Sequence, residues 1–223
     1  MEINHSYPWA HTAAEAIKIQ QELVSQVVTE DRLGEVNYVA GVDVGFEDNY
    51  TITKAAAVVL SFPELTEVEY AIAHRPTTFP YIPGFLSFRE IPALLAALEK
   101  LTITPDLILC DGQGIAHPRK FGLACHLGVI LDLPTIGVAK SLLVGKHEEL
   151  PTEKGNWRPL VYKGETVGVV LRSRTNVKPL YISSGHQISL PTAIDYVLRC
   201  TPKYRLPETT RKADRLASSR ILS

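Results

Sequence analysis

Two aspartates lie at positions where their side chains could share a metal ion. Asp43 lies within the apolar stretch VAGVDVGF, and Asp111 directly follows the apolar stretch LILC. A carboxylate among apolar residues is costly to bury unless another group pairs with it. If these two apolar stretches form neighbouring β-strands, both carboxylates lie at the sheet edge where ligands gather in open α/β sheets. Each aspartate alone is equally consistent with a cap or turn, but together they favour a divalent cation, which relieves the repulsion between them.

Three further residues belong to the same hypothesis. Glu90 lies four and eight residues before Leu94 and Leu98, at the edge of a helical apolar stripe, where a solvated glutamate is the alternative. Asp214 likewise lies at the boundary between the apolar and polar faces of a predicted helix. An ion pair with a neighbouring arginine is its alternative interpretation. Lys140 closes the stretch TIGVAK, where it would hold a phosphate or position an attacking water. A lysine that extends from the strand end to solvent is equally consistent with the pattern.

A glycine-rich stretch, DGQGIAHPRKFG, begins at Asp111 and leads into a helix. Its glycines allow backbone N–H groups to approach a ligand at a helix N-terminus, which suits a phosphate. The GK[ST] ending of a P-loop is missing. His117 is a candidate donor to a base or phosphate, with a simple His-Pro turn as the alternative. His186, in SSGHQISL, is interpreted as structural.

The hydrophobic pattern predicts a mixed α/β sheet in a single domain, residues 1–223. Strands are expected at residues 36–46, 54–62, 67–75, 106–112, 134–142, 158–171 (a hairpin turning at Lys163-Gly164) and 178–183, the first three as an antiparallel meander. Helices are expected at residues 13–28, 88–101, 119–132, 191–200 and 207–219. In the first helix, the expected buried face contains Ala13, Ile17, Leu23 and Val27.

Composition limits the class of protein. The chain has 223 residues, of which 45% are hydrophobic and 21% charged, as in an ordinary globular domain. No apolar run suits a membrane span, and the N-terminal residues lack the pattern of a signal peptide, so a cytoplasmic monomer is expected. The three cysteines form no CxxC pair, which argues against a disulfide framework or thiolate zinc site. The net charge is −1, but residues 199–220 hold seven basic residues against two acidic ones, consistent with nucleic-acid binding or a solvated helix face.

Six sequence blocks together resemble the endonuclease V family. They are GVDV, PYIPGFLSFRE, LCDGQGIAHPRKFGLACHLGV, IGVAKS, SSGHQISLPTA and YRLPETTRKAD, in the order expected of that family. The similarity as a whole covers about residues 12–218. The resemblance implies an α/β, ribonuclease H-like mixed β-sheet with helices on both faces. One departure is Gly45, a position where serine is expected more often.

The resemblance also implies roles for the acidic residues and the lysine. The metal-binding and catalytic carboxylates of the family match Asp43, Glu90 and Asp111. The C-terminal position of the metal site, where members carry His or Asp, matches Asp214. The lysine of the GVAK block matches Lys140. The implied cofactor is Mg²⁺, with Mn²⁺ as a substitute.

The PYIP turn matches the wedge that family members push into a duplex. Its aromatic residue is Tyr81, and Pro80, Ile82 and Pro83 complete the turn. The two prolines stiffen the loop, which lowers the entropy lost when the ring enters the base stack. A mispaired base costs less to unstack than a paired one, and the family flips that base into a pocket. The positions that match the base pocket are Gly84, Gly112, Gly114 and His117.

The activity implied by the resemblance is that of a deoxyinosine 3′ endonuclease. Such an enzyme binds DNA that contains deaminated bases and hydrolyses the second phosphodiester bond 3′ to the lesion. The products carry 3′-hydroxyl and 5′-phosphate ends. An inosine-specific ribonuclease and a non-catalytic module that binds inosine or lesions are the alternatives.

Overall fold

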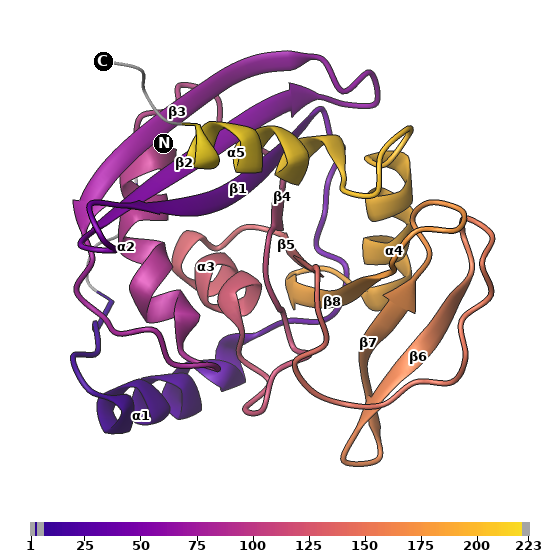
Figure 1. The fold of residues 1–223 in the computed structure, drawn as a ribbon, viewed down its shortest axis with the longest axis horizontal. Helices are drawn as coiled ribbons and strands as arrows, with labels where there is room; N and C mark the ends of the chain where they lie inside the picture. Colours follow the sequence, from indigo (N-terminus) through magenta and orange to yellow (C-terminus); the bar gives the residue numbers. More distant parts are fainter. Residues whose placement is uncertain (1–2, 4–6, 220–223) are drawn as a thin grey trace.

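The computed structural model describes residue 3 and residues 7–219 and is built around one eight-stranded sheet (Figure 1). The order of the strands across the sheet is β3-β2-β1-β4-β5-β8-β7-β6. The strands are β1 (Tyr38–Glu47), β2 (Ile52–Ser61), β3 (Glu67–Pro76), β4 (Leu107–Cys110), β5 (Thr135–Ala139), β6 (Trp157–Tyr162), β7 (Glu165–Leu171) and β8 (Leu180–His186). The helices are α1 (Ala13–Leu23), the short 3₁₀ helix η1 (Val24–Gln26), α2 (Leu86–Leu98), α3 (Leu123–Leu131), α4 (Leu190–Arg199) and α5 (Glu208–Ser218).

Strand pairing directs the C-terminal ends of three parallel strands toward one edge of the sheet. The strands β1, β2 and β3 form the predicted antiparallel meander, and β1 pairs in parallel with β4. The strand β5 continues the parallel arrangement beside β4, whereas β8, β7 and β6 pair in antiparallel fashion. The predicted hairpin turns at Lys163 and Gly164, whose φ angles of 52° and 83° suit a two-residue turn between antiparallel strands. The C-terminal ends of β4 and β5 therefore lie beside the middle of β1, and Asp111, Lys140 and Asp43 occupy these positions.

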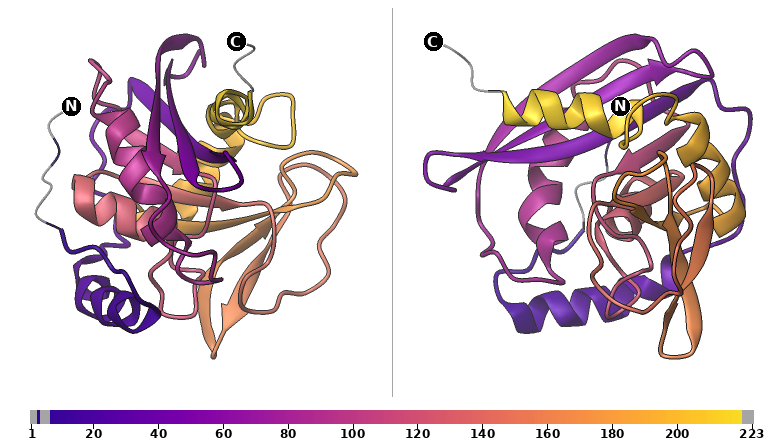
Figure 2. Two further views of the ribbon diagram at one scale, coloured as in Figure 1. Left: turned by 60° about the vertical axis from the view of Figure 1, so that its left-hand side comes forward. Right: turned by 45° about the vertical axis from the view of Figure 1, so that its right-hand side comes forward.

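Helices cover both faces of the sheet, as expected. Because side chains alternate along a strand, Ala40 and Val42 of β1 pack in the core cluster shared with α2 and α3, whereas Val39 packs in the cluster shared with α4. Figure 2 shows α5 lying along β1 and β2 on the face opposite α2 and α3. None of the helices in the described part of the chain has the length and apolar character that a membrane crossing requires.

The predicted apolar face of the first helix was correct in part, because Leu23 is buried and Ala13 and Val27 are partly buried against the core, whereas Ile17 is exposed. The α-helix ends at Leu23, and its buried residues are Ala16, Ile19, Gln20 and Leu23. Ile17 is 36% exposed. A polar residue occupies the inner face because the Gln20 side chain has a buried partner, donating from Nε2 to the Gly84 carbonyl at 3.0 Å.

Candidate active site

Three carboxylates converge where β4 ends beside the middle of β1. The parallel register places Val42 beside Cys110, so Asp43 and Asp111 follow on adjacent strands as predicted. The helix α5 adds Asp214, and one ligand atom from each of the three carboxylates lies within 4.8 Å of the others. Mg²⁺ binds oxygen ligands at about 2.0–2.1 Å, so ligands on opposite sides of the ion lie about 4.2 Å apart. The donor type and spacing therefore fit a hard divalent cation.

Glycine on β1 lets α5 approach closely enough to deliver Asp214. A Cβ atom at Gly41 would lie 2.1 Å from the carbonyl carbon of Thr209, and one at Gly45 would lie 2.4 Å from the carbonyl oxygen of Ala217. Any side chain at these two positions would push the helix away from the sheet. The alternation of Gly41, Asp43 and Gly45 along one face of β1 thus places a carboxylate directly beneath a tightly packed helix.

Lys140 supplies positive charge among the carboxylates. Its ammonium forms ion pairs with Asp111 and, at 3.1 Å, with Asp214. Burial lowers the pKa of Lys140, but the Asp111 carboxylate outweighs this effect and raises the pKa. Burial, followed by the charge of Asp111, raises the pKa of Asp43 to about 8. Burial also raises the pKa of Asp111. In the absence of a cation, the carboxylates of this cluster are therefore only partly ionised.

Glu90 approaches the cluster from the other face of the sheet. It lies on α2, and burial followed by the charges of Asp43 and Asp111 raises its pKa to about 8. The three carboxylates that fall within 4.8 Å of one another do not include Glu90. Its part as a direct metal ligand stays a prediction, whereas its electrostatic coupling to the two aspartates is a feature of the fold.

We expect the metal-free protein to lose stability as the pH rises from about 6.5 to 8. Asp43 and Glu90 have pKa values near 8 when folded, against ordinary values of 3.8 and 4.5. The folded state then binds more protons, so their contribution is present at low pH and is lost as pH rises toward 8. Each extra bound proton changes the unfolding free energy by about 1.4 kcal/mol per pH unit. Urea denaturation in EDTA at several pH values measures this slope.

The comparison with Asp43→Asn isolates the carboxylate. Burial lowers the pKa of His117 and His126, so the protein loses stability as the pH falls below about 6.5. This pH dependence is opposite in direction to that of the carboxylates. Asp43→Asn leaves their contribution in place and removes one raised carboxylate. The variant should therefore show a shallower loss of stability between pH 6.5 and 8 than the wild type, and equal slopes would contradict the assignment.

A cavity of about 330 Å³ adjoins the carboxylates, close to the lower end of the roughly 300–1,000 Å³ usual for small-molecule sites. Its metal-side lining includes Glu90, Asp111 and Lys140. Its other lining residues include Tyr81, Pro83, Gly84, Gly112, Leu142 and Leu143. The predicted wedge, part of the predicted base pocket and the acidic cluster thus meet in one place.

Tyr81 projects from an anchored loop. Its side chain is 69% exposed, and Pro80 and Pro83 are also exposed. Ile82 is half-buried and packs on a cluster of aromatic side chains that includes Phe79. Ile82 therefore anchors the turn, and Tyr81 is the residue of the turn with the freedom and size to enter a base stack.

His117 holds this loop in place. Its Nε2 donates to the Gly84 carbonyl at 2.9 Å, and its Nδ1 accepts from the Arg119 backbone N–H at 3.2 Å. Burial lowers the pKa of His117 to about 4, which keeps the ring neutral with one donor and one acceptor. The same carbonyl also accepts from Gln20 and Arg119. Both ring nitrogens of His117 are engaged within the protein, so this geometry does not show the expected donation to a base.

Gly114, which was predicted to lie at the base pocket, packs tightly against a neighbouring strand in this structure. Its N–H donates to the Ser183 hydroxyl at 2.9 Å, and a Cβ at this position would lie 2.1 Å from the Ser184 carbonyl oxygen. Gly114 therefore serves the close packing of its loop against β8, and it is not part of the cavity lining. Gly84, Gly112 and His117 line the cavity, and their contact with a flipped base stays a prediction.

Most of the basic C-terminal region is used within the protein. Arg199 stacks on Phe62, Arg211 pairs with Glu208, and Lys212 pairs with Glu67. His186 accepts from the Val28 N–H at 3.3 Å, in agreement with its structural interpretation.

Arg205 is a site residue that sequence reasoning missed. It donates to the carbonyls of Lys178, Pro179 and Lys140 at 2.8, 2.8 and 3.0 Å. Through the last of these bonds it fixes the backbone from which the Lys140 ammonium extends. Its place in the block YRLPETTRKAD was the signal available in the sequence.

The mixed sheet, with Asp43 on β1 and Asp111 directly after the adjacent parallel strand β4, has the architecture of a ribonuclease H-like nuclease. The family model for Endonuclease V matches residues 21–215. Endonuclease V from Rippkaea orientalis is 69% identical over 220 residues, covering 99% of this chain and 96% of the relative. The chain belongs to the endonuclease V family.

Solved structures agree with this assignment. Endonuclease V from Streptomyces avermitilis superposes with a TM-score of 0.89 at 45% identity, covering 96% of this chain and 94% of the other. The enzyme from Ciona intestinalis, in complex with a 24mer DNA containing an inosine followed by a ribo-adenosine, superposes with a TM-score of 0.81 at 33% identity, covering 92% and 95%.

Proposed function

We propose that this chain is a DNA repair endonuclease that recognises deoxyinosine and hydrolyses the second phosphodiester bond 3′ to the lesion. The products would carry 3′-hydroxyl and 5′-phosphate ends. The observation that carries the proposal is the junction of an acidic cluster with a cavity whose rim bears an exposed tyrosine. The inosine-containing DNA bound by the Ciona relative supports the choice of lesion.

Asp43, Asp111 and Asp214 would hold Mg²⁺, with Glu90 at the cavity side of the site. A bound Mg²⁺ would neutralise charge on the scissile phosphate and lower the pKa of a coordinated water. The carboxylates that hold the cation also orient it relative to the cavity. Mn²⁺ offers similar ligand chemistry and is expected to substitute.

Lys140 and Glu90 would act on the phosphate and the proton. The Lys140 ammonium, which pairs with Asp111 and Asp214, would stabilise the negative charge that develops on the phosphate. Glu90 lines the same cavity and would accept the proton of the attacking water at its carboxylate. The raised pKa of Glu90 in the metal-free protein suits proton exchange near neutral pH.

The nicking assay tests the proposal directly. A deoxyinosine-containing oligonucleotide duplex, its undamaged twin and an inosine-containing RNA are incubated with Mg²⁺, and the products are mapped to single-nucleotide resolution. We expect a single nick at the second bond 3′ to deoxyinosine and no cutting of the undamaged twin. Equal cutting of the deoxyinosine-containing duplex and its undamaged twin would overturn the proposal. Preferred cutting of the RNA would favour the ribonuclease, and binding without cutting would favour the non-catalytic module.

Tyr81→Ala is expected to reduce kcat/KM on deoxyinosine duplex about 10- to 100-fold, with a smaller loss on single-stranded substrate. The ring would fill the gap left by the flipped base, and a duplex requires unstacking whereas a single strand does not. Stability should change by less than about 0.5 kcal/mol, because the side chain is 69% exposed. Tyr70→Ala on β3, where the side chain is 56% exposed, is the matched control. Equal losses on both substrates would exclude the wedge.

A further inference from the structure

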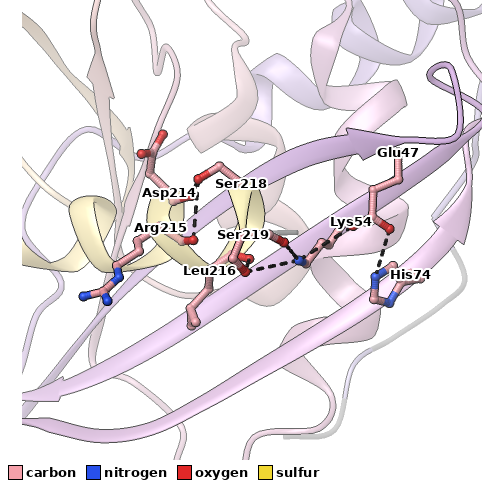
Figure 3. A network of polar contacts seen from close by, with 8 residues as sticks. All are labelled: Glu47, Lys54, His74, Asp214, Arg215, Leu216, Ser218 and Ser219. Atoms are coloured by element: carbon pink, nitrogen blue, oxygen red, sulfur yellow. Dashed lines mark hydrogen bonds and ion pairs between the residues drawn. The ribbon is translucent and has the colours of Figure 1, made fainter. Parts of the chain in front are cut away.

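Lys54 is a fully buried lysine that the proposed chemistry does not use. It lies on β2 within the apolar stretch ITKAAAVVL, and its side chain is 0% exposed. Its ammonium donates to the Ser219 carbonyl and to the Ser219 hydroxyl at 3.3 Å, and it lies 3.7 Å from Glu47 (Figure 3). Glu47 in turn pairs with His74 at 3.4 Å. A buried ammonium is costly, so such a residue calls for a reason beyond stability.

The sheet register places Lys54 on the same face as Asp43. In the antiparallel pair, Asp43 lies opposite Ala56, and Gly45 lies opposite Lys54. Lys54 is therefore one strand over and two residues further along β1, a displacement of about 6.6–6.8 Å along the strand. Each helical turn of α5 advances by about 5.4 Å. The helix thus contacts the carboxylate cluster through Asp214. Roughly one turn later along the helix, it contacts the ammonium of Lys54.

The end of α5 is closed by polar contacts, and Lys54 connects it to the sheet. The Ser219 N–H donates to the Arg215 carbonyl at 3.1 Å, and the Ser219 hydroxyl donates to the Leu216 carbonyl at 2.8 Å. The Ser218 hydroxyl donates to the carbonyl of Asp214 itself at 2.6 Å. A positive charge at this position also complements the partial negative charge of a helix C-terminus.

Among the described residues, the same helix end borders a hollow on one side. A hollow of about 900 Å³, lined by residues 45–50 and 217–219, borders the last turn. The close approach over Gly45 sets the distance of the helix from the sheet. Directional contacts restrict sliding along β1 and rotation about the helix axis, and the contact of Lys54 with the Ser219 carbonyl is one of them, beside the Lys212–Glu67 ion pair.

We propose that Lys54 is a positioning residue that sets the rotation and axial position of α5 and thereby aims the Asp214 carboxylate at the metal site. This inference rests on the proposed function, in which Asp214 holds the cation. Without Lys54 the helix should still pack, but Asp214 should sample orientations that do not converge with Asp43 and Asp111. The consequence is weaker metal binding rather than a slower reaction at saturating metal.

Lys54→Met tests the proposal, because methionine fills a similar volume without the ammonium and leaves Glu47 able to reach solvent. Free Mn²⁺ is measured by electron paramagnetic resonance in a titration of the DNA-free protein, and nicking is measured as a function of Mg²⁺. We expect the Kd for Mn²⁺ and the Mg²⁺ concentration for half-maximal nicking to rise about 5- to 20-fold, with kcat at saturating Mg²⁺ within about two-fold. Lys54→Arg, which keeps charge and donors, should recover much of the affinity.

The matched control is Lys100→Met. Lys100 also donates to a backbone carbonyl, that of Ile72 at 2.6 Å, on an exposed part of the molecule. Its replacement should leave metal affinity unchanged. If Lys100→Met and Lys54→Met weaken Mn²⁺ binding equally, the effect is general destabilisation and the proposal fails.

A double-mutant cycle separates this inference from the function beneath it. Asp214→Ala should weaken Mn²⁺ binding, and adding Lys54→Met should then cause no further loss, because the residue through which Lys54 acts is gone. Additive losses would overturn the positioning role. No effect of Asp214→Ala would refute the metal assignment of Asp214 instead. Should Lys54→Met lack the native circular dichroism spectrum, Lys54→Gln takes its place in the cycle.

Discussion

Asp43→Asn is expected to reduce Mg²⁺-dependent nicking of deoxyinosine DNA by at least about 10³-fold and, at the same time, to stabilise the metal-free protein at pH 8. The loss of activity follows because asparagine offers a neutral oxygen where the cation needs a charged ligand, and 10³-fold corresponds to about 4 kcal/mol of activation free energy. The gain in stability follows because burial and the charge of Asp111 disfavour ionisation of Asp43, whose pKa is raised to about 8. Single-turnover nicking and urea denaturation measure the two effects.

These opposite signs distinguish a functional carboxylate from a structural one. A residue that merely held the fold together would lose stability and activity in the same direction. Asp195→Asn is a suitable control, since Asp195 is exposed on α4 and forms an ion pair with Arg199 one turn later. That variant should leave both quantities within experimental error. Full Mg²⁺-dependent cutting by Asp43→Asn would remove the catalytic assignment.

Gly41→Ala is expected to destabilise the protein by about 2–3 kcal/mol and to weaken metal binding together with stability. The new methyl group would lie 2.1 Å from the Thr209 carbonyl carbon and 2.6 Å from the Thr210 nitrogen. These are backbone atoms at the start of α5, so the helix itself must move, and overpacking of this kind costs about 1–3 kcal/mol or more. Because α5 carries Asp214, the displacement also opens the carboxylate cluster.

Gly34→Ala provides the matched comparison. A Cβ atom at Gly34 would meet no heavy atom within 4 Å, so the same glycine-to-alanine change occurs in open space. Its effect on stability should be small or slightly favourable, because alanine restricts the unfolded chain. Denaturant unfolding and Mn²⁺ titration of both variants test the difference, and equal behaviour would show that α5 is not held as closely to β1 as the structure indicates.

The unexpected glycine at position 45 has the same explanation. The resemblance favours serine there, yet a Cβ would lie 2.4 Å from the Ala217 carbonyl oxygen in this chain. Glycine therefore accords with the close approach of α5 over β1. The difference concerns how near the helix lies and leaves the Asp43 carboxylate in place.

The sequence by itself determined the elements and the principal acids. Alternation and short apolar runs located the strands, including the meander and the β6–β7 hairpin, because a strand's burial pattern is a local property with a period of two. The positions of Asp43 and Asp111 relative to their strands made their convergence predictable once β1 and β4 were taken as neighbours. The PYIP turn predicted an exposed Tyr81 on a stiff loop, and the side chain is exposed.

Only the tertiary structure decided which distant groups touch. It placed Asp214 and Lys140 among the aspartates, kept Glu90 outside the group of three, and showed that His117 holds the Gly84 loop. It also assigned Gly114 to packing against β8. These outcomes depend on how closely a helix or loop approaches the sheet, which is set by contacts between residues far apart in the chain. A local pattern carries periodicity, but it carries neither those distances nor the partners that satisfy a buried polar group.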